Sequence, residues 1–192
     1  MPKLPAPVSN LNIANLLTVI RLVLVPTFVW LMFLEGVSAR WAALAVFCLA
    51  SLTDKLDGTL ARRYNLITNF GKLADPIADK LLVLSALIML SLELPWLWLL
   101  TVPVAIREVG ITVMRLLLAN EVVLAASMGG KVKTAAQILL IVLLLVPWYS
   151  VAPGWWTPIV VVVVILSVIV GVITLLTGVQ YLREAMRIHR DA

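Results

Sequence analysis

Residues 54–79 read DKLDGTLARRYNLITNFGKLADPIAD, and this stretch decides how the rest of the chain is interpreted. It contains four of the ten acidic residues of the chain, namely Asp54, Asp57, Asp75 and Asp79. The sequence on both sides is apolar enough to lie in a membrane. Because carboxylates at membrane depth are costly, they mark functional sites by default. We therefore expect the rest of the chain to hold these four groups together.

The composition predicts an all-α integral membrane protein with a single domain over residues 1–192. The chain is 62% hydrophobic and 13% charged, with a mean hydropathy of +1.08, whereas a soluble domain is about half apolar. The net charge of +5 is interpreted as loop charge that sets topology, not as a nucleic-acid site, because no basic soluble module is present. The single cysteine, Cys48, excludes an intrachain disulfide and is expected to be a buried thiol.

The apolar runs predict six transmembrane helices. They cover residues 15–34, 41–62, 72–92, 96–119, 131–146 and 157–182, with a lead-in over 1–14 and a tail over 183–192. The low-complexity run 159–173 is expected to face lipid without chemistry of its own.

The distribution of basic residues predicts the orientation in a cell (inner or plasma) membrane. With six spans, fourteen of the fifteen Lys and Arg residues fall on one side, and only Arg40 falls on the other. The positive-inside rule then places both termini, the lead-in and the tail in the cytosol. The aspartates lie at the same end, so the site is expected to face the cytoplasm.

The spacing of the aspartates predicts a metal site. Asp54 and Asp57 are three residues apart, and Asp75 and Asp79 are four apart, so each pair shares one face of its helix. The short connection makes the two helices antiparallel neighbours, so that the pairs can converge. Converging carboxylates repel one another unless cations or protons lie between them. Oxygen ligands suit Mg²⁺, Mn²⁺ or Ca²⁺, and the absence of a His or Cys cluster argues against zinc. Four carboxylates suit two such ions with open positions for phosphate oxygens.

Small residues follow the first aspartate pair. Gly58 lies four after Asp54, and Ala61 lies four after Asp57, which leaves a smooth patch for a flat ligand or for a second helix. Arg62 can hold a phosphate bidentately, or it can simply extend to the membrane surface. Gly71 opens the next helix and leaves room for the same ligand.

The pattern Asp54-x2-Asp57-Gly58-x2-Ala61-Arg62-x8-Gly71-x3-Asp75-x3-Asp79 resembles the signature of the CDP-alcohol phosphotransferase family without a departure. The resemblance extends over nearly the whole chain. The segments NIANLLTVIRLVLVP, IREVGITVMRLLLA and GGKVKTAAQ are similar to the subgroup that makes phosphatidylglycerophosphate.

The resemblance implies a six-helix membrane enzyme, usually a homodimer, that joins CDP-diacylglycerol to sn-glycerol 3-phosphate and releases CMP. It implies two divalent cations, Mg²⁺ or Mn²⁺, and assigns Asp79 the further role of general base. The metal ligands would be Asp54, Asp57, Asp75 and Asp79. The CDP site would be lined by Asp57, Gly58, Ala61, Arg62 and Gly71.

Basic residues at the predicted cytosolic half of the fourth and fifth spans form the candidate pocket for the acceptor phosphate. Arginine within a span is costly unless it meets an anion. These residues are Arg107, Arg115, Lys131 and Lys133. Glu108 is expected to pair with one of them. The alternative interpretation is that all four are topology charges that extend to the membrane surface.

Other functions stay open at this stage. The same chemistry can act on another acceptor, such as inositol phosphate, serine or phosphatidylglycerol. A divalent-cation channel or transporter is a different class, in which the aspartates form the permeation site. That class leaves the Gly-x2-Ala-Arg segment unexplained.

Overall fold

The computed structural model describes the backbone of residues 13–63, 69–117 and 128–191. It describes the side chains of residues 16–53, 77–78, 80–113, 132–180 and 183. Every regular element in these stretches is a helix, which confirms the predicted all-helical class. The predicted lead-in lies almost entirely outside the described residues.

Six long helices account for most of the structure, and each predicted span falls on one of them. They are α1 (Ile13–Phe33), α2 (Val37–Arg63), α3 (Asn69–Glu93), α4 (Trp98–Leu117), α5 (Met128–Leu145) and α7 (Trp156–Asp191). Three short elements connect them: η1 (Pro95–Leu97), α6 (Trp148–Val151) and η2 (Pro153–Trp155).

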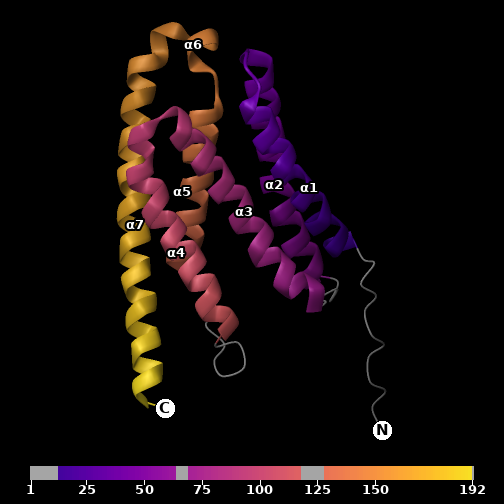
Figure 1. Ribbon diagram of the computed structural model, residues 1–192, viewed down its shortest axis with the longest axis vertical. Coiled ribbons are helices and arrows are strands. Elements are labelled where there is room, and N and C mark those ends of the chain that lie inside the picture. Colours follow the sequence, from indigo (N-terminus) through magenta and orange to yellow (C-terminus); the bar gives the residue numbers. More distant parts are fainter. Residues whose placement is uncertain (1–12, 64–68, 118–127, 192) are drawn as a thin grey trace.

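Consecutive long helices run in opposite directions along the long axis of the molecule (Figure 1). The beginning of α1, the end of α2, the beginning of α3 and the end of α7 therefore lie at one end, which we call the aspartate end. The α1–α2 turn, α6 and η2 lie at the opposite end, which we call the turn end.

The apolar character of the helices supports an integral membrane protein. Within the described residues, three stretches are long and apolar enough to cross a membrane by length and composition: Leu16–Phe33, Pro95–Val113 and Pro153–Gln180. Shorter apolar helices cover Val37–Thr53 and Val132–Leu145. Six crossings and their orientation stay predictions.

The helices form two groups that share one core. In Figure 1, α1, α2 and α3 lie together on one side, and α4, α5 and α7 lie together on the other. Contacts of α3 with α4 and α5, and of α2 with α5, join the groups. Phe28 of α1 and Phe47 of α2 are fully buried, with ring centroids 5.9 Å apart. Burial of this apolar surface fixes the rotation of each helix about its axis, and therefore the direction in which its polar side chains point.

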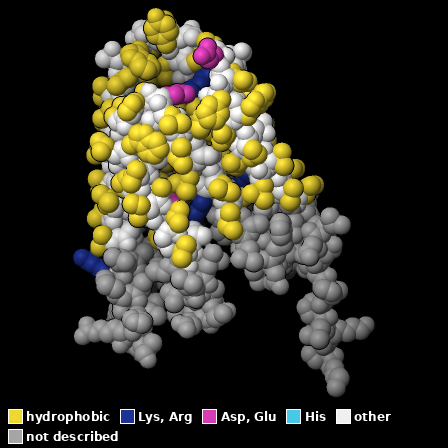
Figure 2. All heavy atoms as spheres, in the orientation of Figure 1, with side chains coloured by type: hydrophobic (Ala, Val, Ile, Leu, Met, Phe, Trp, Pro, Cys, Tyr) yellow, Lys and Arg dark blue, Asp and Glu magenta, His cyan; other side chains and the backbone are white. Residues whose placement is uncertain are grey.

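The outer surface of the bundle is apolar, as Figure 2 shows for one face. On α7, the buried positions Val163, Ser167, Val170, Thr174 and Thr177 recur every three or four residues, which defines one packed face. Most other side chains of the run 159–173 are exposed, as expected for a lipid-facing helix.

The prediction of a buried Cys48 is wrong, because the thiol is exposed on α2. The neighbouring Phe47 and Ala50 take the packed positions of the helix, so Cys48 points away from the core. In a membrane protein an apolar sequence context does not imply burial in protein, since lipid covers the outer face.

The turn between α1 and α2 depends on Gly36, which has a φ of 108°. Residues with a Cβ rarely adopt this backbone conformation. The turn lets α2 begin at Val37, four residues earlier than the predicted span.

Candidate functional site

The aspartate signature lies on two neighbouring antiparallel helices. Asp54, Asp57, Gly58, Ala61 and Arg62 belong to α2, whereas Gly71, Asp75 and Asp79 belong to α3. The two helices contact each other, and the end of α2 and the beginning of α3 both lie at the aspartate end (Figure 1). The side chains of these eight residues lie outside the described residues. The predicted arrangement of the helices is therefore present, and the convergence of the carboxylates stays a prediction.

Glu108 of α4 is the centre of a buried group of charges. Lys133 of α5 pairs with its Oε1 atom, and Lys80 of α3 pairs with its Oε2 atom. Nη1 of Arg107 lies 2.7 Å from Oε1. We call these four residues the Glu108 cluster; it joins three helices through one carboxylate.

Burial makes the Glu108 cluster energetically important. Lys133 is 1% exposed and Glu108 is 6% exposed. A charge removed from water is tolerated when it is paired and hydrogen-bonded. Removal of one partner leaves the remaining charges buried without compensation, which destabilises the protein strongly. The cluster therefore restrains α3, α4 and α5 relative to one another at this depth.

Two of the four predicted acceptor-phosphate residues belong to this cluster. Arg107 and Lys133 meet at Glu108, and the expected pairing of Glu108 is confirmed. Arg115 lies on α4 and Lys131 on α5, with side chains outside the described residues. That the four residues hold a phosphate stays a prediction.

Arg107 is also supported from α7. A Cβ added to Gly178 would lie 3.6 Å from Cγ of Arg107, so the stem of the arginine runs along the glycine. The missing side chain at position 178 lets Arg107 pass between α4 and α7 toward Glu108.

A polar cavity of about 120 Å³ lies beside the Glu108 cluster. Its wall comes from five helices and includes the fully buried Arg21 of α1. The polar residues that line it are Arg21, Ser51, Lys80, Glu108, Thr134 and Gln137.

The polar cavity adjoins the predicted metal site along the chain. Lys80 directly follows Asp79 on α3, and Ser51 precedes Asp54 by three residues on α2. Three residues of α-helix correspond to about 4.5 Å along the axis. The cavity and the aspartates therefore belong to the same region of the bundle.

The residues that line the polar cavity were not predicted as site residues, and three of them show why. Ser51, Lys80 and Gln137 are single polar residues beside apolar sequence, and each has an ordinary structural interpretation by itself. The usable signal was the high cost of a lysine or a glutamine within a membrane span. Only the packing of five helices shows that the three face one cavity.

Metal binding is not tested by the described part of the chain. No group of three or more His, Cys, Asp or Glu residues lies within those residues, and the four aspartates fall outside it. The donor set of the signature is oxygen only, which fits hard divalent cations.

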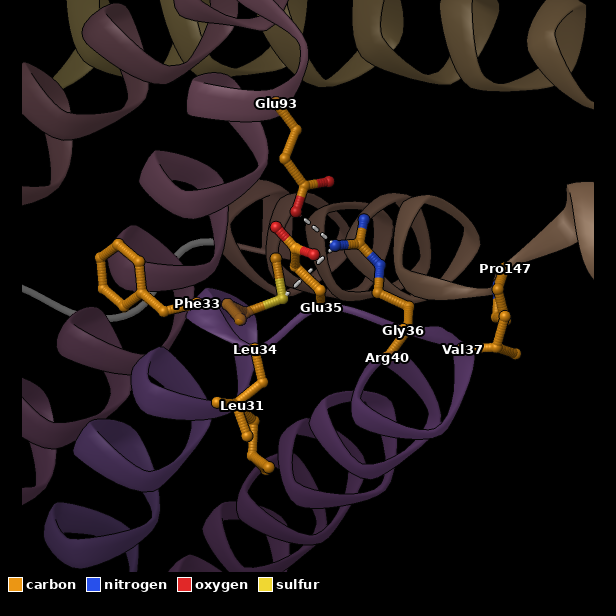
Figure 3. Close-up of a pocket in the computed structure, with 10 residues that line it drawn as sticks. Leu31, Phe33, Leu34, Glu35, Gly36, Val37, Arg40, Glu93 and Pro147 are labelled. Carbon is orange, nitrogen blue, oxygen red and sulfur yellow. Dashed lines mark hydrogen bonds and ion pairs between the residues drawn. The ribbon is translucent and has the colours of Figure 1, made fainter.

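A larger pocket of about 440 Å³ lies at the turn end (Figure 3). Arg40 faces Glu93 across it, with Nη1 2.5 Å from Oε1. The guanidinium also donates to the carbonyl oxygens of Leu144 and Leu145, at 3.3 and 3.2 Å. Arg40 thus joins α2, α3 and α5 far from the aspartates, which fits a structural role.

The fold and the site define a helical membrane protein with an acidic signature on adjacent helices and buried basic groups beside it. A family model described as CDP-alcohol phosphatidyltransferase matches residues 11–181. The chain belongs to this family, and the resemblance inferred from the aspartate spacing is confirmed.

Three relatives show where in the family the chain lies. It is 50% identical over 131 residues to a "Probable phosphatidylglycerophosphate synthase" of Mycobacterium tuberculosis (strain CDC 1551 / Oshkosh), covering 66% of this chain and 62% of the relative. Proteins named "CDP-diacylglycerol--glycerol-3-phosphate 3-phosphatidyltransferase" match from Bacillus subtilis (strain 168), 43% identical over 141 residues, and from Escherichia coli (strain K12), 41% identical over 133 residues. Each of these two matches covers 66% of this chain and 72% of the relative. The match thus spans less than two thirds of the mycobacterial relative.

Proposed function

We propose that the protein transfers the phosphatidyl group of CDP-diacylglycerol to sn-glycerol 3-phosphate, giving phosphatidylglycerophosphate and CMP. Family membership and the names of the three relatives support this reaction. The structural observation that carries it is the Glu108 cluster, where the buried Lys133 and the partly buried Lys80 and Arg107 come from three helices and lie beside the aspartate signature. A phosphorylated acceptor supplies the anion that such cations attract.

In the proposed reaction, Asp79 accepts the proton of the acceptor hydroxyl. The hydroxyl oxygen attacks the phosphorus that carries the lipid, and the bond from that phosphorus to the CMP oxygen breaks. A carboxylate within reach of the reacting hydroxyl is a suitable general base. Two divalent cations, Mg²⁺ or Mn²⁺, held by Asp54, Asp57, Asp75 and Asp79, would neutralise charge on the pyrophosphate.

The remaining residues bind and orient the two substrates. Asp57, Gly58, Ala61, Arg62 and Gly71 are proposed to bind CDP. Arg107, Arg115, Lys131 and Lys133 are proposed to bind the acceptor phosphate. The position of Arg107 and Lys133 in the Glu108 cluster supports the second assignment, because their ammonium and guanidinium groups are held close to one another before the substrate arrives.

We further propose a homodimer with six spans per chain and both termini in the cytoplasm, so that the site takes its water-soluble acceptor from that side. The antiparallel order of six long helices supports the even number of crossings, since α1 begins and α7 ends at the aspartate end.

Release of CMP by the purified protein tests the reaction. The assay contains CDP-diacylglycerol in detergent, with Mg²⁺, with Mn²⁺ or with a chelator, and each acceptor in turn. We expect metal-dependent CMP release with sn-glycerol 3-phosphate. Release with inositol phosphate, serine or phosphatidylglycerol but not with glycerol 3-phosphate would reject the proposed acceptor. Metal flux without CMP release would reject the enzyme.

A further inference from the structure

Two polar groups of the cavity wall have no hydrogen-bond partner among the residues that the structure describes. Gln137 is 2% exposed, and its Nε2 atom meets no acceptor. The Oγ atom of Ser51 is likewise buried without a partner within the described structure. Both residues line the polar cavity. A buried donor without a partner destabilises a fold unless a ligand or water completes it.

The chemistry of the wall favours a neutral hydroxyl as that ligand. A hydroxyl accepts a hydrogen bond from an amide and donates one to a second oxygen. The cations in the wall are Arg21 and Lys80, and Lys80 already pairs with the carboxylate of Glu108, which also lines the cavity. A phosphate therefore suits the cavity less well than a neutral group. Arg107 and Lys133 pair with Glu108 without lining the cavity, so a phosphate has cationic partners beside the cavity.

The size of the cavity also limits which ligand it can hold. A volume of about 120 Å³ cannot hold a nucleotide, but it holds a hydroxyl-bearing carbon or a few water molecules. The wall includes Lys80, the residue after the proposed base Asp79. The cavity therefore lies within about one helical turn of the depth of Asp79, which is within reach of an acceptor whose reacting hydroxyl lies at that residue.

We propose that the polar cavity binds the hydroxyl of glycerol 3-phosphate that does not react, the one on the middle carbon, and that Gln137 and Ser51 recognise it. This assignment rests on the proposed function and adds to it a determinant of acceptor specificity. The reacting hydroxyl then lies toward Asp79 and the phosphate toward Arg107 and Lys133. The three functional groups of the acceptor each meet a separate set of residues.

The test compares glycerol 3-phosphate with 3-hydroxypropyl phosphate, which lacks only the middle hydroxyl. Wild-type protein is expected to prefer glycerol 3-phosphate by roughly 10- to 100-fold in kcat/KM, because a site that hydrogen-bonds a hydroxyl rejects the analogue without it. Gln137→Leu is expected to reduce that preference about tenfold or more, by raising the KM for glycerol 3-phosphate. The KM for CDP-diacylglycerol should not change.

Two further variants make the outcome decisive. Gln180→Leu makes the same chemical change at an exposed position of α7 and should keep the wild-type preference. Ser51→Ala removes a single oxygen atom and should lower the preference even if Gln137→Leu fails to fold. An unchanged preference in folded Gln137→Leu and Ser51→Ala would overturn the inference and assign the cavity to water. Absence of CMP release by wild-type protein with glycerol 3-phosphate would instead reject the proposed function itself.

Discussion

Glu108 is a single carboxylate that pairs with three cations. It therefore has a larger effect on the stability of the protein than a surface charge has. Lys80, Arg107 and Lys133 each approach one of its two oxygen atoms. Exposed ion pairs contribute little to stability because water competes for both partners. At Glu108 water is largely excluded, so the carboxylate decides whether the cations can stay inside the bundle.

Glu108→Gln is expected to lower the stability of the protein by about 3 kcal/mol, since the change leaves buried cations without their anion at almost unchanged shape. In a chain of this size such a loss lowers the unfolding midpoint by roughly 6–12 °C. Thermal unfolding of purified protein in detergent measures it.

The double variant Glu108→Gln with Lys133→Met separates charge from shape. If pairing is the cause, the second change relieves part of the first, and the double variant is less destabilised than the two single changes added together. Strict additivity would show that the pairing of Lys133 with Glu108 contributes nothing to stability.

Asp57→Ala is expected to abolish CMP release while the protein still folds, because the proposed metal site loses a ligand on which its geometry depends. The measurement is the assay of CMP release with Mg²⁺ or Mn²⁺, and a thermal unfolding scan checks the fold. Turnover near that of wild type would reject the two-metal site.

At the scale of residues, the sequence predicts those groups of residues whose members lie at fixed helical spacing. The signature residues of 54–79 lie close together in the chain, so helix periodicity alone pairs them. Arg107 and Lys133 could be predicted from their cost in a span. The roles of Lys80 and Gln137 could not, because Lys80 pairs with Glu108 of another helix and Gln137 shares its cavity with residues of four other helices, which only packing reveals.

At the scale of elements, α7 contributes more than a lipid-facing surface. Gly171 and Gly178 lie seven residues apart on its packed face, next to Leu100 and Arg107 of α4. Small residues let two helices approach closely within a membrane. The interface of α4 and α7 therefore helps to fix the direction in which Arg107 points.

Gly178→Leu is expected to displace Arg107, because a Cβ at this position already lies in contact with its Cγ atom at 3.6 Å. We expect a lower unfolding midpoint and a KM for glycerol 3-phosphate raised several-fold, while Gly178→Ala stays close to wild type. Steady-state kinetics with each substrate measures the effect.

The matched control is Gly110→Leu on α4, where an added Cβ meets no atom within 4 Å of the described structure. If leucine at either glycine lowers the unfolding midpoint and raises the KM for glycerol 3-phosphate equally, the cause is helix propensity and not the contact with Arg107.

Hydrophobic runs predicted the long helices well, since a helix in lipid must satisfy its own backbone. The short elements α6 and η2 fall between the predicted spans 131–146 and 157–182 and were not predicted as helices. Their conformation depends on local bonds, such as the 2.7 Å bond that Nε1 of Trp148 donates to the carbonyl of Leu143. Hydropathy carries no information on such bonds.

At the scale of the whole molecule, charge is distributed unevenly between the two ends. Arg40 lies at the turn end and is held there by Glu93 and by carbonyl groups of α5. The arginine is thus partly neutralised, which reduces its weight as a topology signal. By the positive-inside rule, the basic residues toward the other end then predict that the aspartate end faces the cytoplasm.

This orientation predicts which residues are labelled from outside the cell. In a Cys48→Ser background, Ser150→Cys in α6 is expected to react with a membrane-impermeant maleimide added to intact cells, because Ser150 is exposed at the turn end. Arg183→Cys, on the exposed surface of α7 toward the aspartate end, is expected to react only after the cells are made permeable. The Cys48→Ser protein alone is the control for background labelling. The reverse labelling pattern would place the aspartates outside the cell, where the proposed site would have no access to a cytoplasmic acceptor. Labelling of both positions in intact cells would require an even number of crossings between them, in conflict with the single crossing by helix α7 that this orientation assumes.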